Sequence, residues 1–278
     1  MSAVPEIMLN NGRTIPQFGF GVFLVKPEET AAAVSTALQT GYRHIDTAEG
    51  YGNEKEVGEA IRKSGLDRSD VFVTSKLAND AHRPDDARRA FDASLDALGF
   101  DYVDLFLIHW PLPTRYDGDF VSTWRTLEEF YRDGRARSIG VSNFQAHHLR
   151  RLHTEAEVPP VIDQIEMHPY LTQDELRAFC AEHQIAVEGW APIGRGRVLD
   201  DPEIVTIAQR TGKTPAQVVL RWHIERGDII FPKSITPARI RENFDIFDFE
   251  LSGEDVEAIS ALNRNERFGP DPDTFDMV

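Results

Sequence analysis

The chain has 278 residues, of which 41% are hydrophobic and 27% charged, so its composition is that of a globular protein. Its 46 acidic residues against 30 Lys and Arg give a net charge of −16, which argues against a nucleic-acid partner, because phosphate binding needs clustered positive charge. No apolar run approaches the ~20 residues of a membrane helix, and the start, M-S-A-V-P-E-I, lacks a leader pattern. We therefore expect a cytoplasmic protein without a membrane partner.

The first expected element is a β-hairpin with strands at 7–9 and 14–15 and a turn at Asn11-Gly12. A lone hairpin is only marginally stable in water, so we expect it to cap the bottom of a larger unit. The single cysteine, Cys180, cannot form an intrachain disulfide. It lies on the inward side of the helical pattern L-R-A-F-C-A, where we expect a small buried core residue.

Eight short apolar runs are expected to form strands. They cover residues 18–22, 43–46, 71–76, 103–109, 138–142, 161–166, 185–190 and 228–232. Amphipathic helical patterns separate them at spacings of about 30 residues, which predicts βα units and a parallel sheet. Eight units in a chain of this size predict an α/β fold, a closed (β/α)8 TIM barrel, as a single domain over 1–278. An open dinucleotide-binding sheet is disfavoured, because Gly19-x-Gly21 lacks a third glycine where Leu24 stands.

Several helices have recognisable start signals of the capping-box, N-terminal proline or acidic first-turn type. They are Pro27 with Glu28 and Glu29, Thr172 with Glu175, Asp201-Pro202, Thr214-Pro215, Thr236-Pro237, and Ser252 before an acidic turn.

Ionisable side chains stand where three successive predicted strands end. These are Asp46, Lys76 and His109, and Tyr51 follows in the loop after Asp46, bracketed by glycines. Each residue alone has an ordinary structural explanation, as a helix cap, a solvated lysine or a core histidine. In a barrel, however, the carboxyl ends of neighbouring strands share one rim, so we expect these four groups to converge.

The four groups together suit a proton-donor assembly. A tyrosine has an ordinary pKa of ~10, and a nearby ammonium favours the phenolate and lowers that pKa. Asp46 would hold Lys76, His109 would bind the oxygen of a carbonyl, and Tyr51 would protonate that oxygen as hydride arrives.

Two other chemistries are weaker. A zinc site could use Asp46 and His109, but it would need a third ligand, and His44, His147 and His148 stand apart in the sequence. A serine hydrolase would need a G-x-S-x-G elbow, which the chain lacks.

The later strands end in a different set of groups. Ser142-Asn143, Gln164 and Trp190 offer amides and a flat ring, and Lys233, Arg239 and Arg241 cluster at a helix start. Such a set suits a nicotinamide dinucleotide stretched across the barrel. The alternatives are barrel-top packing for Trp190 and a solvated helix face for the basic cluster.

Four separated motifs resemble the aldo-keto reductases over essentially the full length. They are G-Y-R-H-I-D-T-A-x-x-Y-G-N-E, D-Y-V-D-L-F-L-I-H-W-P, I-G-V-S-N-F and K-S-x(4)-R-x-x-E-N. The chain looks most like the prokaryotic branch that includes 2,5-diketo-D-gluconate reductase.

This resemblance implies an NADPH-dependent reductase of aldehydes, ketones or dicarbonyls, working as a monomer. It implies a catalytic tetrad of Asp46, Tyr51, Lys76 and His109 with Tyr51 as general acid, and a C-terminal loop at about 264–278 over the active-site rim. By the same matching, Ser142, Asn143 and Gln164 would hold the carboxamide and Trp190 would stack on the nicotinamide. Lys233, Ser234 and Arg239 would meet the 2′-phosphate, and Glu242 and Asn243 the adenine.

The chain departs from its relatives mainly around the substrate. Ala78 stands where a pocket tryptophan is common, and Gly50 where bulkier residues are frequent, so we expect a larger pocket. Phe23 and Trp110 would complete that pocket together with the tail near Phe268 and Phe275. Thr236 replaces an arginine that some relatives carry near the phosphate, which bears on NADPH preference. The competing interpretation of the whole chain is a nicotinamide-dinucleotide-binding sensor or module with little catalysis.

Overall fold

The computed structural model describes residues 4–278, and its centre is a parallel sheet of eight strands. The strands are β3 (Phe20–Gly21), β4 (His44–Asp46), β5 (Phe72–Leu77), β6 (Leu105–Ile108), β7 (Ile139–Ser142), β8 (Ile162–Glu166), β9 (Ala186–Trp190) and β10 (Ile229–Ile230). They lie side by side in chain order, and the first and last approach each other through Gly19 N to Ile230 O at 2.7 Å and Ile230 N to Gln17 O at 3.0 Å. The predicted (β/α)8 barrel is confirmed.

The closing seam explains why two of the expected strands are short. β3 and β10 each form a regular ladder over two residues only, against expected runs at 18–22 and 228–232. Pro232 has no N–H to donate, and its carbonyl instead accepts from Gly21 N at 3.3 Å. The seam is therefore joined by a few separate bonds rather than by a continuous ladder.

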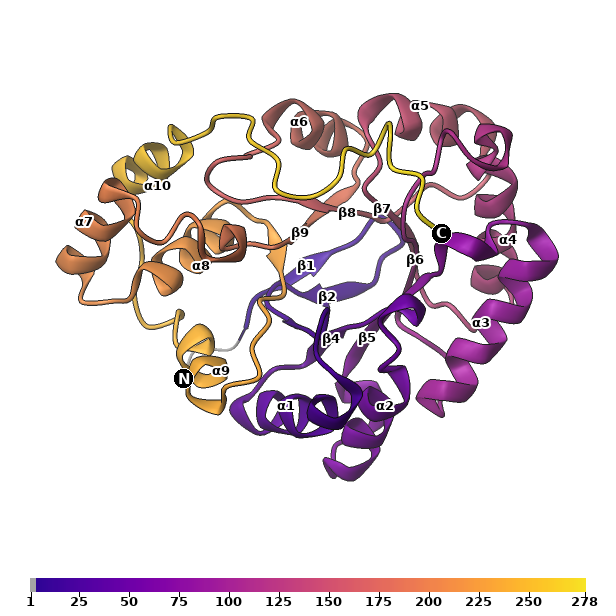
Figure 1. Cartoon of the computed structure of the whole chain (residues 1–278), viewed down its shortest axis with the longest axis horizontal. Coiled ribbons are helices and arrows are strands. Elements are labelled where there is room, and N and C mark those ends of the chain that lie inside the picture. Colours follow the sequence, from indigo (N-terminus) through magenta and orange to yellow (C-terminus); the bar gives the residue numbers. More distant parts are fainter. Residues whose placement is uncertain (1–3) are drawn as a thin grey trace.

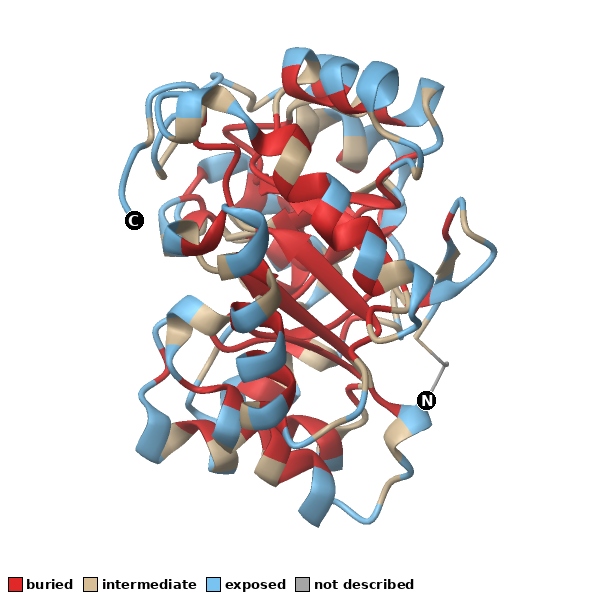
Figure 2. Cartoon of the chain, turned by 90° about the vertical axis from the view of Figure 1, so that its right-hand side faces the viewer, coloured by how far each residue is buried: buried red, intermediate tan, exposed pale blue. Residues whose placement is uncertain are grey.

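Ten α-helices surround the sheet in the described part of the chain. They are α1 (Pro27–Thr40), α2 (Glu54–Lys63), α3 (Pro84–Leu98), α4 (Phe120–Arg132), α5 (Ala146–Glu155), α6 (Asp174–Glu182), α7 (Pro202–Thr211), α8 (Pro215–Glu225), α9 (Pro237–Phe244) and α10 (Gly253–Ser260). Figure 1 shows them as an outer ring. On α3, for example, the buried Ala87, Phe91, Leu95 and Leu98 recur at helical spacing. Figure 2 shows the result, buried strands inside and exposed outer helix faces.

Most of the expected helix starts are confirmed. Thr214 and Gln217 form a capping box, as do Ser252 and Asp255, and Asp201 accepts from Glu203 N at 3.0 Å. Helices α1 and α9 begin at Pro27 and Pro237 as expected, although the Thr236 side chain makes no capping bond.

The start expected at Thr172 is wrong. Helix α6 begins at Asp174, and Gln173 before it has a left-handed backbone with φ of 57°. Thr172 Oγ1 donates to Asp174 Oδ2 at 2.8 Å, so its hydroxyl does not cap the helix. The sequence matched a capping-box pattern with Thr172 as N-cap, but the N-cap is Gln173, one residue later.

The predicted N-terminal hairpin is confirmed as an antiparallel pair, β1 (Glu6–Met8) and β2 (Thr14–Pro16), turned where Gly12 has φ of 80°. It sends apolar side chains into the barrel bottom, where they join residues at or near the starts of three barrel strands. This cluster includes Leu9, Ile15, Leu105, Val161, Ile162 and Ile229. Asn10 Nδ2 also donates to Pro160 O at 3.0 Å, so the hairpin is fixed by polar contacts as well as by burial.

Two further observations complete the fold. Cys180 is buried in the main core cluster, as expected. No helix within residues 4–278 combines the length and the apolar character needed to cross a membrane.

Asp163 is a buried acid with few partners, which yields a stability prediction. It is fully buried on β8, its Oδ2 has no hydrogen-bond partner, and Oδ1 accepts only from Phe144 N at 3.4 Å. Burial raises the pKa of Asp163 well above its ordinary value. The folded state therefore holds a proton that the unfolded chain has lost above pH ~4, and stability falls as the pH rises.

We expect Asp163→Asn to stabilise the protein at pH 8 by about 1 to 3 kcal/mol, with the gain shrinking toward pH 4. Denaturant unfolding at both pH values measures it. Asp104→Asn is a matched control with the opposite expected effect. Arg68 lies 2.9 Å from the Asp104 carboxylate, so removing this negative charge should destabilise the fold. If Asp163→Asn instead lost stability, and lost more as the pH rises, burial of a protonated Asp163 would be contradicted.

Candidate functional site

The four groups expected at the strand ends meet on one side of the barrel rim. Asp46 ends β4, Lys76 lies near the end of β5, and His109 directly follows β6; these strands are neighbours in the sheet. Tyr51 ends a short 3-10 turn, Glu49–Tyr51, beyond β4. The sheet order therefore brings together residues that are far apart in the sequence.

Asp46 and Lys76 form a buried ion pair. Lys76 Nζ lies 2.8 Å from both carboxylate oxygens of Asp46 and 2.9 Å from Thr47 O, which engages the three ammonium hydrogens. Neither side chain is more than 1% exposed. Burial opposes the charged form of Lys76, but the Asp46 carboxylate outweighs it and raises the lysine pKa. Burial also raises the pKa of Asp46, against the opposing charge of Lys76.

Tyr51 is held close to this pair. Its ring centroid lies 5.0 Å from Lys76 Nζ and 5.7 Å from the ring centroid of His109, edge to face. The loop turns at Gly52, whose φ of 67° suits a residue without Cβ. Asn53 then fixes the loop, accepting from Thr47 Oγ1 at 2.9 Å and donating to Val22 O at 3.0 Å.

The proton balance differs from the expectation in one respect. We expected Lys76 to lower the pKa of Tyr51, yet burial raises that pKa to about 12 and the charge of Lys76 only opposes the rise. Burial and the charge of Lys76 lower the pKa of His109 to about 3. At neutral pH the site thus presents a protonated phenol, a neutral imidazole and an ammonium. Such a set can hydrogen-bond a carbonyl oxygen and protonate it as negative charge develops there.

The amide and indole groups of the later strands are also assembled. Asn143 Nδ2 donates to His109 O at 2.9 Å, and its Oδ1 accepts from Trp190 Nε1 at 2.9 Å. Ser142 Oγ donates to Gln164 O at 2.8 Å. Asn143 therefore links the His109 segment to Trp190. The side chain of Gln164 keeps a free acceptor oxygen, because no described residue donates a hydrogen bond to its Oε1.

Sequence reasoning missed the buried Glu188 and set the buried His44 apart from this site. Glu188 on β9 accepts from Gln164 Nε2 at 2.9 Å, and its other oxygen lies 3.5 Å from His44 Nε2. Both residues are fully buried inside the barrel. Burial and the negative charge of Asp46 raise the pKa of Glu188 to about 8. Trp190 was the available signal for Glu188: residues two apart in a strand share a face, so a Trp190 at the rim places Glu188 on the same side of β9.

The expected phosphate-binding residues lie after β10 and at the start of α9. Lys233 and Arg239 are exposed, Ser234 is partly exposed, and neither cation has an ion-pair partner in residues 4–278. The adenine-site residues differ: Glu242 accepts from Thr214 Oγ1 at 2.9 Å, and Asn243 is buried.

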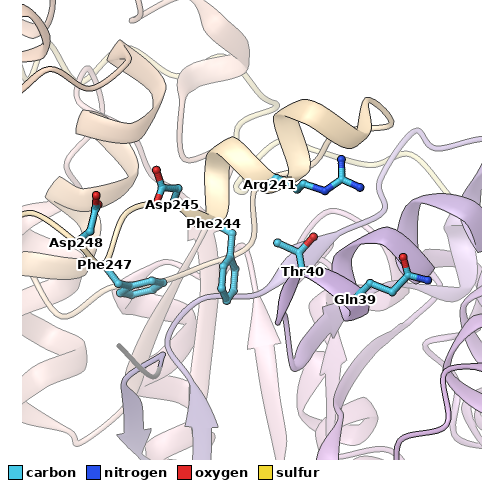
Figure 3. A pocket seen from close by; sticks show the side chains of 7 residues that line it. All are labelled: Gln39, Thr40, Arg241, Phe244, Asp245, Phe247 and Asp248. Atoms are coloured by element: carbon cyan, nitrogen blue, oxygen red, sulfur yellow. The ribbon is translucent and has the colours of Figure 1, made fainter. Parts of the chain in front are cut away.

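Arg241, expected to join Lys233 and Arg239 in one basic cluster, lies apart from them. It lies two residues beyond Arg239 on α9, so the two side chains leave the helix on different sides. In Figure 3 it borders a pocket of about 460 Å³ between the ends of α1 and α9, beside Gln39 and Thr40. This pocket lies outside the barrel and contains none of the four rim groups.

Of the residues expected to shape the substrate pocket, Phe23 contacts Tyr51 and Gly50 precedes it, while Trp110 contacts the tail. The Phe23 ring centroid lies 5.0 Å from that of Tyr51, and Phe23 is 47% exposed. A Cβ added at Gly50 would meet no atom within 4 Å. Trp110 is buried against Phe275 of the C-terminal tail, with ring centroids 4.2 Å apart.

Comparison with known proteins agrees with this geometry. A sequence model of the Aldo/keto reductase family matches residues 18–264. The chain belongs to the aldo-keto reductases. It is 52% identical over 274 residues to an aldo-keto reductase of Mycolicibacterium smegmatis, covering 99% of each chain. It is 48% identical to the glyoxal reductase of Bacillus subtilis, covering 96% of each chain.

A solved structure shares the fold closely. A single-residue mutant of the protein Gox0644, in complex with NADPH, is 44% identical, with a TM-score of 0.94 and 99% of each chain covered. The prediction of an aldo-keto reductase with a TIM barrel is therefore confirmed, and so is its class as an oxidoreductase.

Metal ligation of the rim is disfavoured by the contacts of this reductase. Both oxygens of Asp46 are bound to Lys76, which removes it as a ligand for the zinc alternative. His147 and His148 are not isolated as expected, since Asp273 Oδ1 lies 3.0 and 3.4 Å from their Nε2 atoms. However, His148 Nδ1 accepts from Gln145 N at 3.1 Å, so in neutral His148 the proton is on Nε2 and blocks ligation there.

The tail of the reductase is fastened to the rim at several points. Glu166, at the end of β8, accepts from Phe268 N at 2.7 Å and from Gly269 N at 3.0 Å. Asn79 Nδ2 donates to Met277 O at 2.9 Å. Figure 1 shows the tail passing from α10 across to the side of the barrel that carries β6.

We expect Glu166→Ala to free the start of this tail. Loss of two backbone hydrogen bonds to one carboxylate should raise amide hydrogen exchange at Phe268 and Gly269 by about tenfold or more. Glu182→Ala, at the exposed end of α6, is the control and should leave this exchange unchanged. Unaltered exchange in Glu166→Ala would mean that other contacts hold the tail.

Proposed function

We propose that this aldo-keto reductase reduces aldehydes, ketones or dicarbonyls to alcohols with NADPH, and that Tyr51 is the general acid. The observation that carries the proposal is the convergence of a protonated phenol, a neutral imidazole and a buried Lys–Asp pair on one side of the rim. Bound NADPH supplies the hydride, and the residues of the chain bind the carbonyl and supply the proton.

His109 orients the substrate in this proposal. Its low pKa keeps the imidazole neutral, so it can donate one N–H to the carbonyl oxygen without adding a second positive charge beside Lys76. Tyr51 keeps its own proton until negative charge builds on that oxygen, because an alkoxide is a stronger base than a phenolate. The nearby ammonium of Lys76 then stabilises the phenolate that remains. Asp46 keeps Lys76 charged and in place.

The chain offers groups that fit the parts of NADPH. Gln164 has an unused acceptor oxygen for the carboxamide, with Ser142, Asn143 and Trp190 beside it. Lys233, Ser234 and Arg239 provide unpaired positive charge and a hydroxyl for the 2′-phosphate, and Glu242 and Asn243 lie next to them for the adenine. A relative named glyoxal reductase supports a small dicarbonyl as substrate, and the small residues Gly50 and Ala78 leave room for larger ones.

We expect Tyr51→Phe to lower kcat about 100- to 10,000-fold, because it removes the acid, while NADPH binding persists. Loss of NADPH absorbance with glyoxal as substrate measures turnover. Tyr131→Phe, on the outer helix α4, removes a hydroxyl far from the rim and is the control. Undiminished turnover in Tyr51→Phe would refute the role of Tyr51, and tight NADPH binding without turnover on any carbonyl in the wild type would favour a non-catalytic module.

Arg239→Ala should weaken NADPH binding about 10- to 100-fold and NADH binding much less, because only NADPH has the 2′-phosphate. Titration of intrinsic tryptophan fluorescence gives both dissociation constants. Arg241→Ala is a matched control, since Arg241 borders the pocket outside the barrel. Equal losses for NADPH and NADH in Arg239→Ala would exclude Arg239 from 2′-phosphate recognition.

A further inference from the structure

The amide nitrogen of Gln164 lies between two buried carboxylates. Nε2 donates to Asp46 Oδ2 at 2.8 Å and to Glu188 Oε2 at 2.9 Å. Gln164, Asp46 and Glu188 are each at most 2% exposed, so water does not compete for these bonds. Both hydrogens of the amide nitrogen are therefore used, on two different acceptors.

The strand register explains how Glu188 reaches this place. Gln164 on β8 and Glu188 on β9 are direct partners in the parallel sheet. Trp190 lies two residues beyond Glu188 and shares its face of the strand. One strand thus carries both the carboxylate that contacts Gln164 and the indole proposed to stack on the nicotinamide.

These bonds decide which way round the Gln164 amide lies. The Asp46 carboxylate, paired with Lys76, can only accept, so the atom facing it must be the nitrogen and not the oxygen. Asp46 alone would leave the second amide hydrogen unpaired in a buried place and the group free to twist. Glu188 occupies that hydrogen, and its Oε2 can accept in either protonation state. The planar amide then directs Oε1 away from both acids, where no donor from the described residues meets it.

We propose that Glu188 is a positioning residue that, through Gln164, sets the orientation of the nicotinamide carboxamide. This rests on the proposed function, in which Gln164 Oε1 accepts from the carboxamide NH2. A fixed carboxamide selects the face of the ring, and hence which hydrogen points to the substrate beside Tyr51. Glu188 itself contacts neither cofactor nor substrate.

The test compares two variants with two ligands. Glu188→Leu removes the acceptor, and Glu188→Gln keeps an acceptor oxygen at the same place. The ligands are NADPH and 2′-phospho-ADP-ribose, which has the same phosphates and adenine but no nicotinamide. We expect Glu188→Leu to weaken NADPH about tenfold and the fragment less than twofold, and Glu188→Gln to recover most of the NADPH loss. A merely structural role would weaken both ligands together.

A second measurement uses the unaltered protein, in case Glu188→Leu does not fold. The 3-acetylpyridine analogue of NADP carries an acetyl group in place of the carboxamide and so has no N–H for Gln164 Oε1. We expect it to bind about tenfold more weakly than NADP, because one hydrogen bond to Gln164 Oε1 is lost. Equal binding of NADP and its acetyl analogue would rule out the Gln164 contact through which Glu188 acts, and so overturn its role. Equal losses of affinity for NADPH and for the fragment in Glu188→Leu would overturn it as well. Failure of the wild type to bind or oxidise NADPH would instead refute the proposed function.

Discussion

The buried ion pair between Lys76 and Asp46 is the contact on which the rim depends. Removing one partner from such a pair typically costs about 3 to 5 kcal/mol, because it leaves an uncompensated charge. Here the three ammonium hydrogens are engaged within the protein, on Asp46 and Thr47 O. Lys76 therefore acts on the phenol of Tyr51 mainly through its charge, with Nζ 5.0 Å from the centroid of the ring.

Polar side chains that stay neutral accompany this pair in the barrel core. Apolar residues of the hairpin, Leu9 and Ile15, fill the bottom of the barrel and separate the polar upper part from water at that end. Burial lowers the pKa of His44 to about 3, and Glu188, with a pKa of about 8, is mostly protonated near neutrality. Among Asp46, Lys76, His44 and Glu188, the only charges are then those of the ion pair, which limits the electrostatic cost of burying this cluster.

The sequence predicted the part of the site that depends on topology. Asp46, Lys76 and His109 could be placed together because strand ends in a parallel barrel meet at one rim. Glu188 could have been assigned to the same strand face as Trp190, but the pattern A-V-E-G-W does not indicate its partner, which only the contact with Gln164 shows. Thr172 failed for a related reason: the left-handed backbone at Gln173 is set by the fold and is not visible in a capping pattern.

The C-terminal tail changes how the small residue Ala78 should be understood. Asn79, its neighbour, donates to Met277 O, and Trp110 packs on Phe275, so the tail contacts the segments that follow β5 and β6. In the proposed function, the tail and Ala78 together would set the size of the substrate pocket. Glu166 holds the start of the same tail at the end of β8, so the residues that hold the tail lie on β8 and after β5 and β6. Those of the proposed proton relay lie on or after β4, β5 and β6. Among residues 4–278, no hydrogen-bond partner of the Lys76–Asp46 pair lies in the tail, so a change in the tail would leave these bonds in place.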